Sequence, residues 1–342
     1  MDYSKLRDLL LCPLDDSDLV RRVKLLSENF TTRREKIGEY TLDKKQVSAY
    51  TAFYLPTNIP KINFLLNQLP SEVRENIKKC SLIDYGTGPG TYALGFCDYF
   101  EQLPDIHLID QSSLMLDQAK KLFSEFFPNQ KIHAGSSLSD TGRESLLFFG
   151  NSLNEIPLNE LWDILEKVRP KYFAFIEPGT REFFSKALDI RRGMGQRGYA
   201  SHFPCPSLNY SCPLEKKKDD DWCHQIIHVT HDQEIERISQ MAKLDRRTLP
   251  FIAHLYELEG QCEKPSNSGR LIRIIKETKF SYIWELCLQD ENLKNIKVEL
   301  LKKTIDKKKI KKLSVGIEVS FRILKTLENN TYRVEILNLD NL

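Results

Sequence analysis

The amino-acid sequence predicts an α/β protein with a parallel sheet, a helical N-terminal region and a β-rich C-terminal region. Between residues 81 and 176, short apolar runs alternate with helical segments, a pattern that is typical of βαβ units. The chain before them carries leucines at helical spacing, and the chain after about residue 269 reads as consecutive strands without helices. The length of 342 residues allows about two domains with an appendage, at roughly 150 residues per domain.

The N-terminal region, residues 1–75, is predicted to be helical. Leucines near its start recur three to four residues apart, as they do on one face of a helix. Residues 49–69 have similar spacing but contain Pro56 and Pro60. We expect these prolines to interrupt the helix, because proline has no backbone N–H to donate.

Four apolar runs predict the strands of the central sheet, and helical patterns lie between them. The strands cover residues 81–84, 106–110, 146–149 and 172–176, and the helices cover residues 112–127 and 158–168. Apolar runs without polar alternation are typical of parallel strands that are buried on both faces. A further helix is predicted over residues 232–244.

The C-terminal region carries five strand-like runs with no helical pattern between them. They cover residues 270–275, 280–288, 296–301, 316–324 and 331–337. Such a series predicts a small antiparallel sheet or barrel, for which an OB-like barrel is one candidate. We therefore expect three parts: residues 1–75, residues 76–265 with a cysteine-rich insertion at 200–225, and residues 266–342.

Composition and charge narrow the class of protein. No apolar run approaches the ~18 residues of a membrane span, and the start of the chain lacks the pattern of a secretory signal. We therefore expect a soluble protein in the cytoplasm, or in the mitochondrial matrix if the source is eukaryotic.

The 50 basic and 48 acidic residues nearly balance, so only their distribution can indicate a nucleic-acid partner. Eight cysteines are too few for a disulfide scaffold, and in a reducing compartment clustered cysteines indicate metal binding or catalysis.

A glycine-rich turn follows the first strand of the predicted sheet. Gly86, Gly88 and Gly90 come directly after Asp84, which ends that strand. Glycine permits a tight turn and lets a ligand approach the backbone closely. The next strand ends in Asp110, and an acidic side chain there can accept hydrogen bonds from ribose hydroxyls. The sequence therefore predicts a nucleoside-binding site at the carboxyl edge of the sheet.

The spacing Gly-x-Gly-x-Gly resembles motif I of class I S-adenosylmethionine-dependent methyltransferases, which have a Rossmann-like sheet. The resemblance implies that Asp84 and the three glycines surround the methionine part of the cofactor and that Asp110 holds its ribose. The loop at residues 148–157 lacks the Asn/Asp-Pro-Pro-Tyr motif of amine methylation and the cysteine of carbon methylation. Asn154 and Glu155 in that loop could orient a substrate, but the favoured interpretation is a helix cap and a solvated segment. No catalytic residue is assigned, and methyl transfer is left open.

A second constellation consists of three cysteines in polar sequence. Cys205, Cys212 and Cys223 lie within 19 residues, and the first two precede proline. Soft thiolate ligands favour zinc or an iron–sulfur cluster. A fourth ligand would come from one of four neighbouring or downstream side chains: His202, His224, Cys262 and Cys287.

The order of these motifs resembles the methyltransferase-like proteins associated with the mitochondrial small ribosomal subunit, together with their bacterial relatives. The resemblance covers roughly residues 50–315. The motifs that carry it are the glycine turn, Leu153-Asn-Glu155, Ile176-Glu-Pro-Gly-Thr180, Cys205-Pro, Cys212-Pro-Leu, Asp221-Trp-Cys-His224 and Gly269-Arg-Leu-Ile-Arg273.

The resemblance implies a class I methyltransferase fold that carries a [4Fe-4S] cluster, binds small-subunit ribosomal RNA and acts in small-subunit assembly. The implied cluster ligands are Cys205, Cys212, Cys223 and Cys287, which leaves Cys262 as a bystander. One departure concerns Ser207, because the family usually has histidine after the first Cys-Pro. A second-sphere contact to the cluster is therefore in doubt.

Basic segments indicate where RNA would bind. Residues 297–312 hold eight lysines against two acidic residues, and no aromatic residue lies among them, so we expect recognition of the RNA backbone. Two further basic strips are Arg270, Arg273, Lys276 and Lys279, and Arg191, Arg192 and Arg197. The expected partner is small-subunit ribosomal RNA or an immature small-subunit particle, and the expected state is a monomer.

Three functions are considered. The first is a ribosome-assembly factor that binds S-adenosylmethionine with catalysis reduced or absent. The second is an active ribosomal RNA methyltransferase. The third, ranked below these, is a small-molecule or protein methyltransferase with a structural zinc site in place of the cluster.

Overall fold

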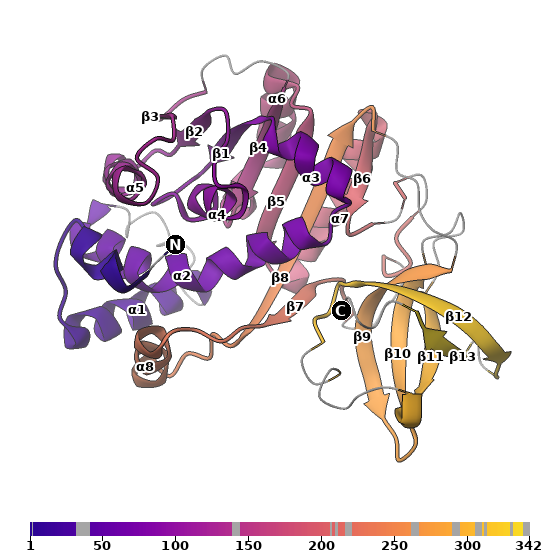
Figure 1. The fold of residues 1–342 in the computed structure, drawn as a ribbon. Coiled ribbons are helices and arrows are strands. Elements are labelled where there is room, and N and C mark those ends of the chain that lie inside the picture. The colour runs from indigo at the N-terminus through magenta and orange to yellow at the C-terminus, as the bar shows by residue number, and fades with distance from the viewer. Residues whose placement is uncertain are drawn as a thin grey trace. The chain divides into compact units, whose positions relative to one another are not determined.

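The computed structural model divides into two compact units (Figure 1). The first comprises Met1–Phe173 and Val229–Thr248, and the second comprises Ala174–His228 and Leu249–Leu342. The division falls within one strand, β5 (Tyr172–Pro178). The residues that the structure describes are 1, 3–31, 42–138, 144–205, 207–208, 211–215, 221–260, 267–288, 295–304, 310, 313–328 and 331–337.

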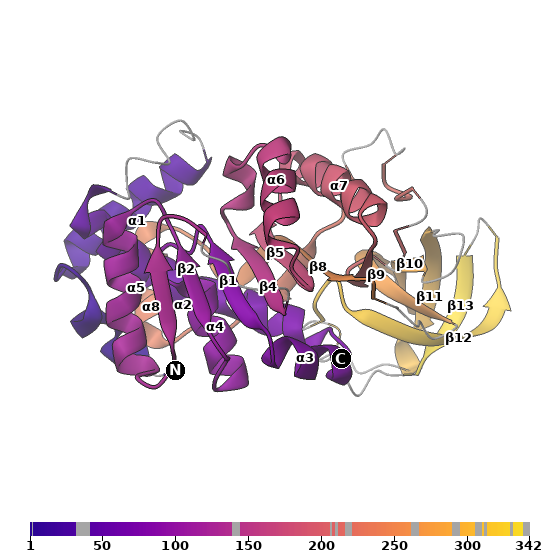
Figure 2. The ribbon, with the colours of Figure 1, turned by 90° about the horizontal axis from the view of Figure 1, so that it is seen from above.

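Four parallel strands form the sheet of the first unit, in the order β3-β2-β1-β4. Figure 2 shows β2, β1 and β4 side by side. The strands are β1 (Ser81–Tyr85), β2 (Ile106–Ile109), β3 (Ile132–Gly135) and β4 (Ser145–Gly150). The predicted strands β1, β2 and β4 are confirmed. Strand β3 was not predicted, because it is a four-residue edge strand with no buried residue.

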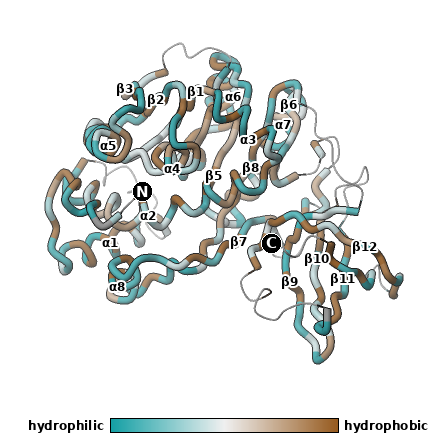
Figure 3. Tube along the Cα trace, in the orientation of Figure 1, coloured by the Kyte–Doolittle hydropathy of each residue, from teal (hydrophilic) through white to brown (hydrophobic). Residues whose placement is uncertain are grey.

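Helices alternate with these strands, as the sequence predicted. They are α3 (Ser71–Lys78), α4 (Thr91–Phe100), α5 (Ser113–Phe126), the 3-10 turn η3 (Leu153–Glu155) and α6 (Leu158–Val168). Helix α5 begins after Ser112, whose Oγ accepts a hydrogen bond from the Met115 N–H at 3.3 Å and so satisfies one free helix donor. Figure 3 shows hydrophilic and hydrophobic residues alternating along the turns of α5, as expected for a helix with one buried face.

The N-terminal region is helical, as predicted, and it shares a core with a later helix of the same unit. Its elements are η1 (Tyr3–Leu9), α1 (Asp16–Thr31) and α2 (Lys44–Asn67), and the later helix is α8 (Gln233–Ala242). Val23 and Leu26 of α1, Phe53 of α2 and Ile238 of α8 belong to one buried cluster. Within the described residues, no helix is long and apolar enough to cross a bilayer.

The expected interruption at Pro56 and Pro60 was wrong, because α2 continues through both residues. A proline inside a helix costs about 3 kcal/mol. This helix is buried along most of its length, and burial of a large apolar side chain contributes about 1.5–3 kcal/mol. Thr57, between the two prolines, donates its hydroxyl to the Phe53 carbonyl at 3.0 Å. Tertiary packing therefore outweighs the local cost.

The second unit contains three strands in the order β5-β8-β6, with β7 paired to β8. Strand β8 spans Thr248–Leu258, β6 spans Tyr199–Phe203 and β7 spans Gln225–His228, and α7 (Arg181–Gln196) follows β5. Strands β6 and β8 are antiparallel. Of these strands, only β5 was predicted from the sequence.

The C-terminal strands of this unit close into a barrel in the order β10-β11-β13-β12-β9. The strands are β9 (Ser268–Glu277), β10 (Ser281–Leu288), β11 (Asn295–Leu301), β12 (Glu318–Thr326) and β13 (Thr331–Ile336). Neighbours are antiparallel except β11 and β13, which are parallel. This connectivity is that of an OB-type barrel, in agreement with the expectation from the sequence. Trp284, Val298 and Val319 are fully buried in it.

Candidate cofactor pocket and cysteine cavity

The glycine turn joins β1 to α4 in the first unit and has a left-handed backbone at each of its three glycines. At Gly86 (φ +71°), an added Cβ would lie 2.4 Å from Ser152 Cβ, so a side chain cannot be accommodated without displacement. At Gly88 (φ +56°), an added Cβ would meet no atom within 4 Å. Gly88 therefore presents bare backbone to open space, as a ligand cradle requires.

Asp110 follows β2 and is tied directly to this turn. Its Oδ2 accepts a hydrogen bond from the Gly88 N–H at 2.8 Å, and its Oδ1 accepts one from the Ser112 N–H at 2.8 Å. Burial raises the pKa of the Asp110 carboxyl, because desolvation disfavours the charged form. Each oxygen keeps acceptor capacity for a ligand hydroxyl.

Asp84 lies beneath the turn and is 1% exposed. Its Oδ2 accepts the Thr87 hydroxyl at 2.7 Å, while its Oδ1 has no hydrogen-bond partner among the described residues. Burial raises the pKa of Asp84 to about 7. The geometry gives Asp84 a role in holding the turn in shape.

A cavity of about 360 Å³ opens at this edge of the sheet, within the usual size range of small-molecule sites. The candidate residues Gly86, Gly88 and Asp110 line it, whereas Asp84 and Gly90 do not. Gly90 instead faces α5, because an added Cβ would lie 3.3 Å from Ala119 Cβ. Glu155, which was interpreted as part of a solvated loop, lies at the exposed margin of the cavity.

Several wall residues of this cavity were not found from the sequence. Tyr50 comes from α2, and its ring stacks on Tyr54 at 5.3 Å between centroids. The guanidinium of Arg246 lies over Tyr54 at 5.4 Å. Asn151, after β4, has a left-handed backbone (φ +58°) and donates from Nδ2 to the Tyr92 hydroxyl at 3.1 Å. A left-handed residue other than glycine after a strand is a common feature of functional sites, but it cannot be read from sequence.

The second unit holds a separate cavity that all four candidate cysteines line. Cys205 follows β6, Cys212 lies in the next loop, Cys223 precedes β7 and Cys287 lies on β10. None of the described cysteines forms a disulfide. Cys262, the expected bystander, lies outside the described residues. Within those residues, no three His, Cys, Asp or Glu side chains are arranged to hold a metal ion.

Burial disfavours the charged forms of Cys212, Cys223 and Cys287 and so raises the pKa of each of these thiols. Burial raises the pKa of Cys212 to about 11, and the neighbouring Cys205 adds to the shift. Burial also raises the pKa of Cys223 well above the ordinary thiol value. The neighbouring Cys205, Cys212 and Cys287 raise it further. Cys212, Cys223 and Cys287 would therefore ionise together only where a cation compensated their charge.

Two buried arginines line the same cavity. Arg270, 5% exposed, donates to the Gly316 carbonyl at 2.8 Å and lies over the Phe203 ring at 4.6 Å. Its buried Nε has no hydrogen-bond partner among the described residues. Arg191, 3% exposed, donates to the Ser207 carbonyl at 2.6 Å. The cavity therefore combines four thiols with two buried guanidinium groups, of which that of Arg270 also lies 3.5 Å from a Glu318 carboxylate oxygen. Thiols are the ligand type that soft metals and iron–sulfur clusters prefer.

The histidines considered as ligands have different surroundings. His224 lines the cavity and stacks on Trp222 at 5.3 Å. His202 does not line it, and its Nε2 contacts Glu257 Oε2 at 2.7 Å. Burial lowers the pKa of His224.

The prediction that two basic strips are available to RNA was wrong for three of their arginines. Arg191 and Arg270 are buried in the cysteine cavity, and Arg273 forms ion pairs with Asp221 and Glu285. A buried or paired guanidinium is not available to a phosphate. Of the lysine run at 297–312, residues 305–309 and 311–312 lie outside the described residues.

Solved structures with similar folds include several methyltransferases at low similarity. An O-methyltransferase family protein from Burkholderia thailandensis is 12% identical, with a TM-score of 0.38 and coverage of 71% of this chain and 72% of that one. Magnesium protoporphyrin IX methyltransferase from Synechocystis with bound S-adenosylmethionine is 14% identical, with a TM-score of 0.34 and coverage of 56% and 89%. Precorrin-6y C5,15-methyltransferase from Geobacter metallireducens is 12% identical, with a TM-score of 0.35 and coverage of 54% and 84%.

The sequence comparison is more specific. No curated protein matches the chain. A family profile described as mitochondrial small ribosomal subunit Rsm22 matches residues 44–313, well over half of the chain. The protein therefore belongs to the Rsm22 family.

Proposed function

We propose that this protein binds S-adenosylmethionine in the cavity of its first unit and acts in the assembly of the small ribosomal subunit. The same proposal assigns it a [4Fe-4S] cluster and binding to small-subunit ribosomal RNA. Membership of a family described by the small ribosomal subunit supports the cellular context. The observation that carries the cofactor assignment is the glycine turn with Asp110 bonded to Gly88 at the mouth of a cavity.

The chain's own residues would bind the cofactor in defined roles. S-adenosylmethionine, when bound, supplies an electrophilic methyl group. Asp110 would accept hydrogen bonds from ribose hydroxyls through the lone pairs that Gly88 and Ser112 leave unused. Gly88 would leave room for the ligand against the backbone, and the stacked Tyr50 would exclude water from one wall.

The cysteine cavity supports the cluster assignment through its chemistry. Cys205, Cys212 and Cys223 come from one loop region and Cys287 from β10, so a bound cluster would tie the loop to the barrel within the second unit. The buried Arg270, which also lies 3.5 Å from Glu318, would offset part of the negative charge of four thiolates. A zinc ion is the alternative to the iron–sulfur cluster, and analysis of the bound metal distinguishes the two.

The remaining organisation is also part of the proposal. We retain three parts, residues 1–75, 76–265 and 266–342, in a monomer. We place the protein in the cytoplasm, or in the mitochondrial matrix of a eukaryote.

Calorimetric titration with S-adenosylmethionine tests the cofactor assignment. Wild-type protein should bind, and Asp110→Ala should weaken binding at least about tenfold, because a half-buried, hydrogen-bonded carboxylate is lost. Asp117→Ala, an exposed carboxylate on α5, is the matched control. Wild-type protein that does not bind the cofactor would contradict the proposal.

Transfer of labelled methyl groups to immature small subunits separates the remaining alternatives. Label in ribosomal RNA would identify an active methyltransferase. Association with the particle without label would identify an assembly factor. Label only in a metabolite fraction or in protein would overturn the ribosomal part of the proposal.

A further inference from the structure

The turn between β9 and β10 carries a large aromatic side chain at its tip. Lys279 and Phe280 are the central residues of this turn, and Phe280 is 70% exposed. The Thr278 N–H donates to the Ser281 carbonyl at 2.8 Å, and Thr278 Oγ1 accepts from the Ser281 N–H at 2.9 Å. The turn therefore closes through backbone and threonine contacts, at positions where glycine, asparagine and aspartate are the usual residues. An exposed phenylalanine at this position contributes little to the free energy of folding, because its ring stays in water.

One lysine side chain lies over this ring, and a second lysine bonds to the backbone of the same residue. The Lys279 Nζ lies 5.2 Å from the centroid of the Phe280 ring. The Lys302 N–H donates to the Phe280 carbonyl at 2.8 Å, which places Lys302 and the exposed Lys303 beside the turn. The lysine run at 297–312 contains no aromatic residue, but it therefore passes next to Phe280 at Lys302.

The charge at this end of the barrel is predominantly positive. Lys302 is partly neutralised, because its Nζ contacts Glu277 Oε1 at 2.5 Å. Lys276, Lys279 and Lys303 are exposed. The position also matters, because OB-type barrels bind oligonucleotides with the loop between their first two strands. The β9–β10 turn is that loop here.

Single-stranded nucleic acid matches this combination of groups. Its phosphates are attracted to lysine, and its unpaired bases stack on exposed aromatic rings. A duplex offers phosphates but keeps its base faces covered by stacking. An exposed aromatic ring among lysines therefore selects for single strands.

We propose that the tip of the β9–β10 hairpin binds single-stranded RNA, with a base stacked on Phe280 and phosphates contacted by Lys276, Lys279 and Lys303. This contact rests on the proposed association with ribosomal RNA and names the part of the chain that makes it. It differs from the backbone recognition expected from the lysine run alone, because it adds a base contact.

Fluorescence anisotropy with full-length protein tests the contact. The probes are a fluorescein-labelled 12-nucleotide oligoadenylate and a labelled RNA duplex of the same length. Phe280→Ala should weaken oligoadenylate binding by about 5- to 150-fold, the effect of losing one stacked base, and should leave duplex binding unchanged. Phe280→Trp should retain wild-type affinity. Lys279→Gln should weaken both probes and reduce the salt dependence by about one phosphate contact.

Leu337→Ala is the matched control, because Leu337 is a 60% exposed apolar residue after β13. Unchanged thermal unfolding of Phe280→Ala would show that the hairpin stays folded. Equal oligoadenylate affinity of wild type and Phe280→Ala, or equal losses for both probes, would overturn the stacking contact. If the wild-type protein still bound immature small subunits in that case, the proposed function would hold without the contact at Phe280. If the wild-type protein bound neither RNA nor the particle, both the proposed function and the contact at Phe280 would be contradicted.

Discussion

The cavity of the first unit and the cysteine cavity of the second are built in different ways. In the first, the groups assigned to the cofactor lie in the glycine turn and directly after β2. These groups bond to one another, as Asp110 does to Gly88. The second is made by side chains from separate segments, with Cys205 and Cys287 far apart in the sequence. Burial raises the pKa of Cys223 in the second, and the neighbouring cysteines add to the shift. The first site is therefore held in shape by its own groups, whereas in the proposed cluster site a bound metal would have to offset the charge of the thiolates.

This difference predicts opposite consequences for removing a ligand. Loss of cofactor from the first unit should leave the fold intact, because the turn and Asp110 satisfy each other. Loss of a cluster from the second unit should loosen the loop that carries three of the four thiols, because like charges and desolvation oppose their approach. The following changes test that contrast.

The largest effect is expected for Cys223→Ser. This variant should lose about four irons and four sulfides per chain, and its free energy of unfolding should fall by about 4 kcal/mol or more, as for other lost metal sites. The measurement is iron and sulfide analysis after anaerobic purification, with thermal unfolding of the same samples. Cys97→Ser, a buried cysteine of the first unit, should keep the metal. One zinc without sulfide would replace the cluster with a zinc site, and wild type without metal would refute the cysteine assignment.

A smaller effect is expected in the glycine turn, where two alanine substitutions should separate stability from binding. Gly86→Ala forces a Cβ against Ser152 at a positive φ and should cost about 3 kcal/mol of stability. Gly88→Ala meets no protein atom and should cost only about 1 kcal/mol. It should nevertheless weaken S-adenosylmethionine binding more than about tenfold, because the new methyl group occupies ligand space. Urea unfolding and calorimetric titration measure the two effects, and equal stability losses in the two variants would contradict the geometry.

The third change concerns the buried Asp84. Its folded-state pKa of about 7 lies above the unfolded value near 3.9, so the folded state binds the proton more tightly. Stability should therefore fall as pH rises from about 4 to 7 and stay level above that, with a loss of about 2–3 kcal/mol between pH 5 and 8. Urea unfolding across this range should show that Asp84→Asn lacks this loss. Asp117→Asn, exposed on α5, should retain the wild-type profile; a flat wild-type profile would remove the argument for a strained carboxylate.

The parts of the molecule that sequence predicted are those with local signals. The glycine turn and Asp110 were identified because backbone geometry there requires particular residues within a short span. Strands β1, β2, β4 and β5 were predicted because buried parallel strands are continuous apolar runs. The edge strand β3 was missed because it has no buried residue.

What could not be predicted depends on distant partners. Tyr50 reaches the first cavity from α2, and no local pattern marks it. Arg270 and Arg273 were assigned to a basic strip for RNA on their charge alone. Their burial and pairing depend on Gly316, Asp221 and Glu285, which are brought together only by the fold.

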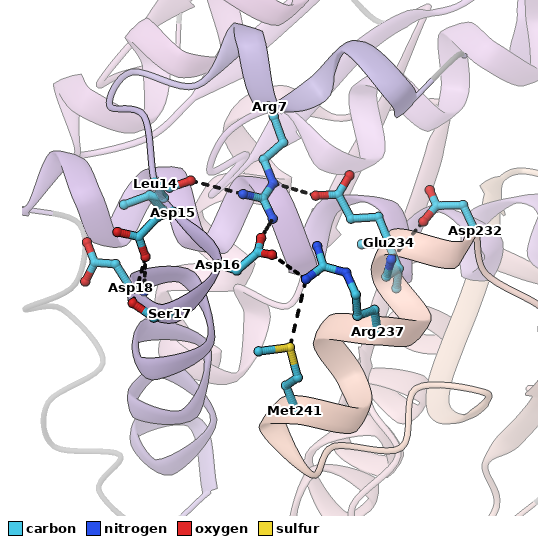
Figure 4. Close-up of polar contacts among 11 residues, drawn as sticks. Arg7, Leu14, Asp15, Asp16, Ser17, Asp18, Asp232, Glu234, Arg237 and Met241 are labelled. Atoms are coloured by element: carbon cyan, nitrogen blue, oxygen red, sulfur yellow. Dashed lines mark hydrogen bonds and ion pairs between the residues drawn. The ribbon is translucent and has the colours of Figure 1, made fainter.

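The smallest effect is expected for the charge network that joins η1, α1 and α8 in the first unit (Figure 4). Asp16 accepts hydrogen bonds from Arg237 and from Arg7, the latter at 2.6 Å, and Arg7 also contacts Glu234 at 2.5 Å. Hydrogen bonds from Arg237 and then Arg7 lower the pKa of Asp16 to about 2. The contribution is therefore present above pH 4 and lost as pH falls through about 2. The Asp16 side chain is 41% exposed, so solvent screening limits the effect.

Asp16→Asn should thus lower the free energy of unfolding at pH 7 by only about 0.5–1 kcal/mol, and added salt should reduce the difference. Urea unfolding at low and high ionic strength measures it, with Asp117→Asn as an exposed helical carboxylate for comparison. A salt-resistant loss above about 2 kcal/mol would mean that the helical part of the first unit depends on side-chain charge. The two units would then not differ in this respect, because both would be stabilised by charged side chains from distant segments. A small, screened loss would instead leave the first unit supported by its backbone and its apolar core.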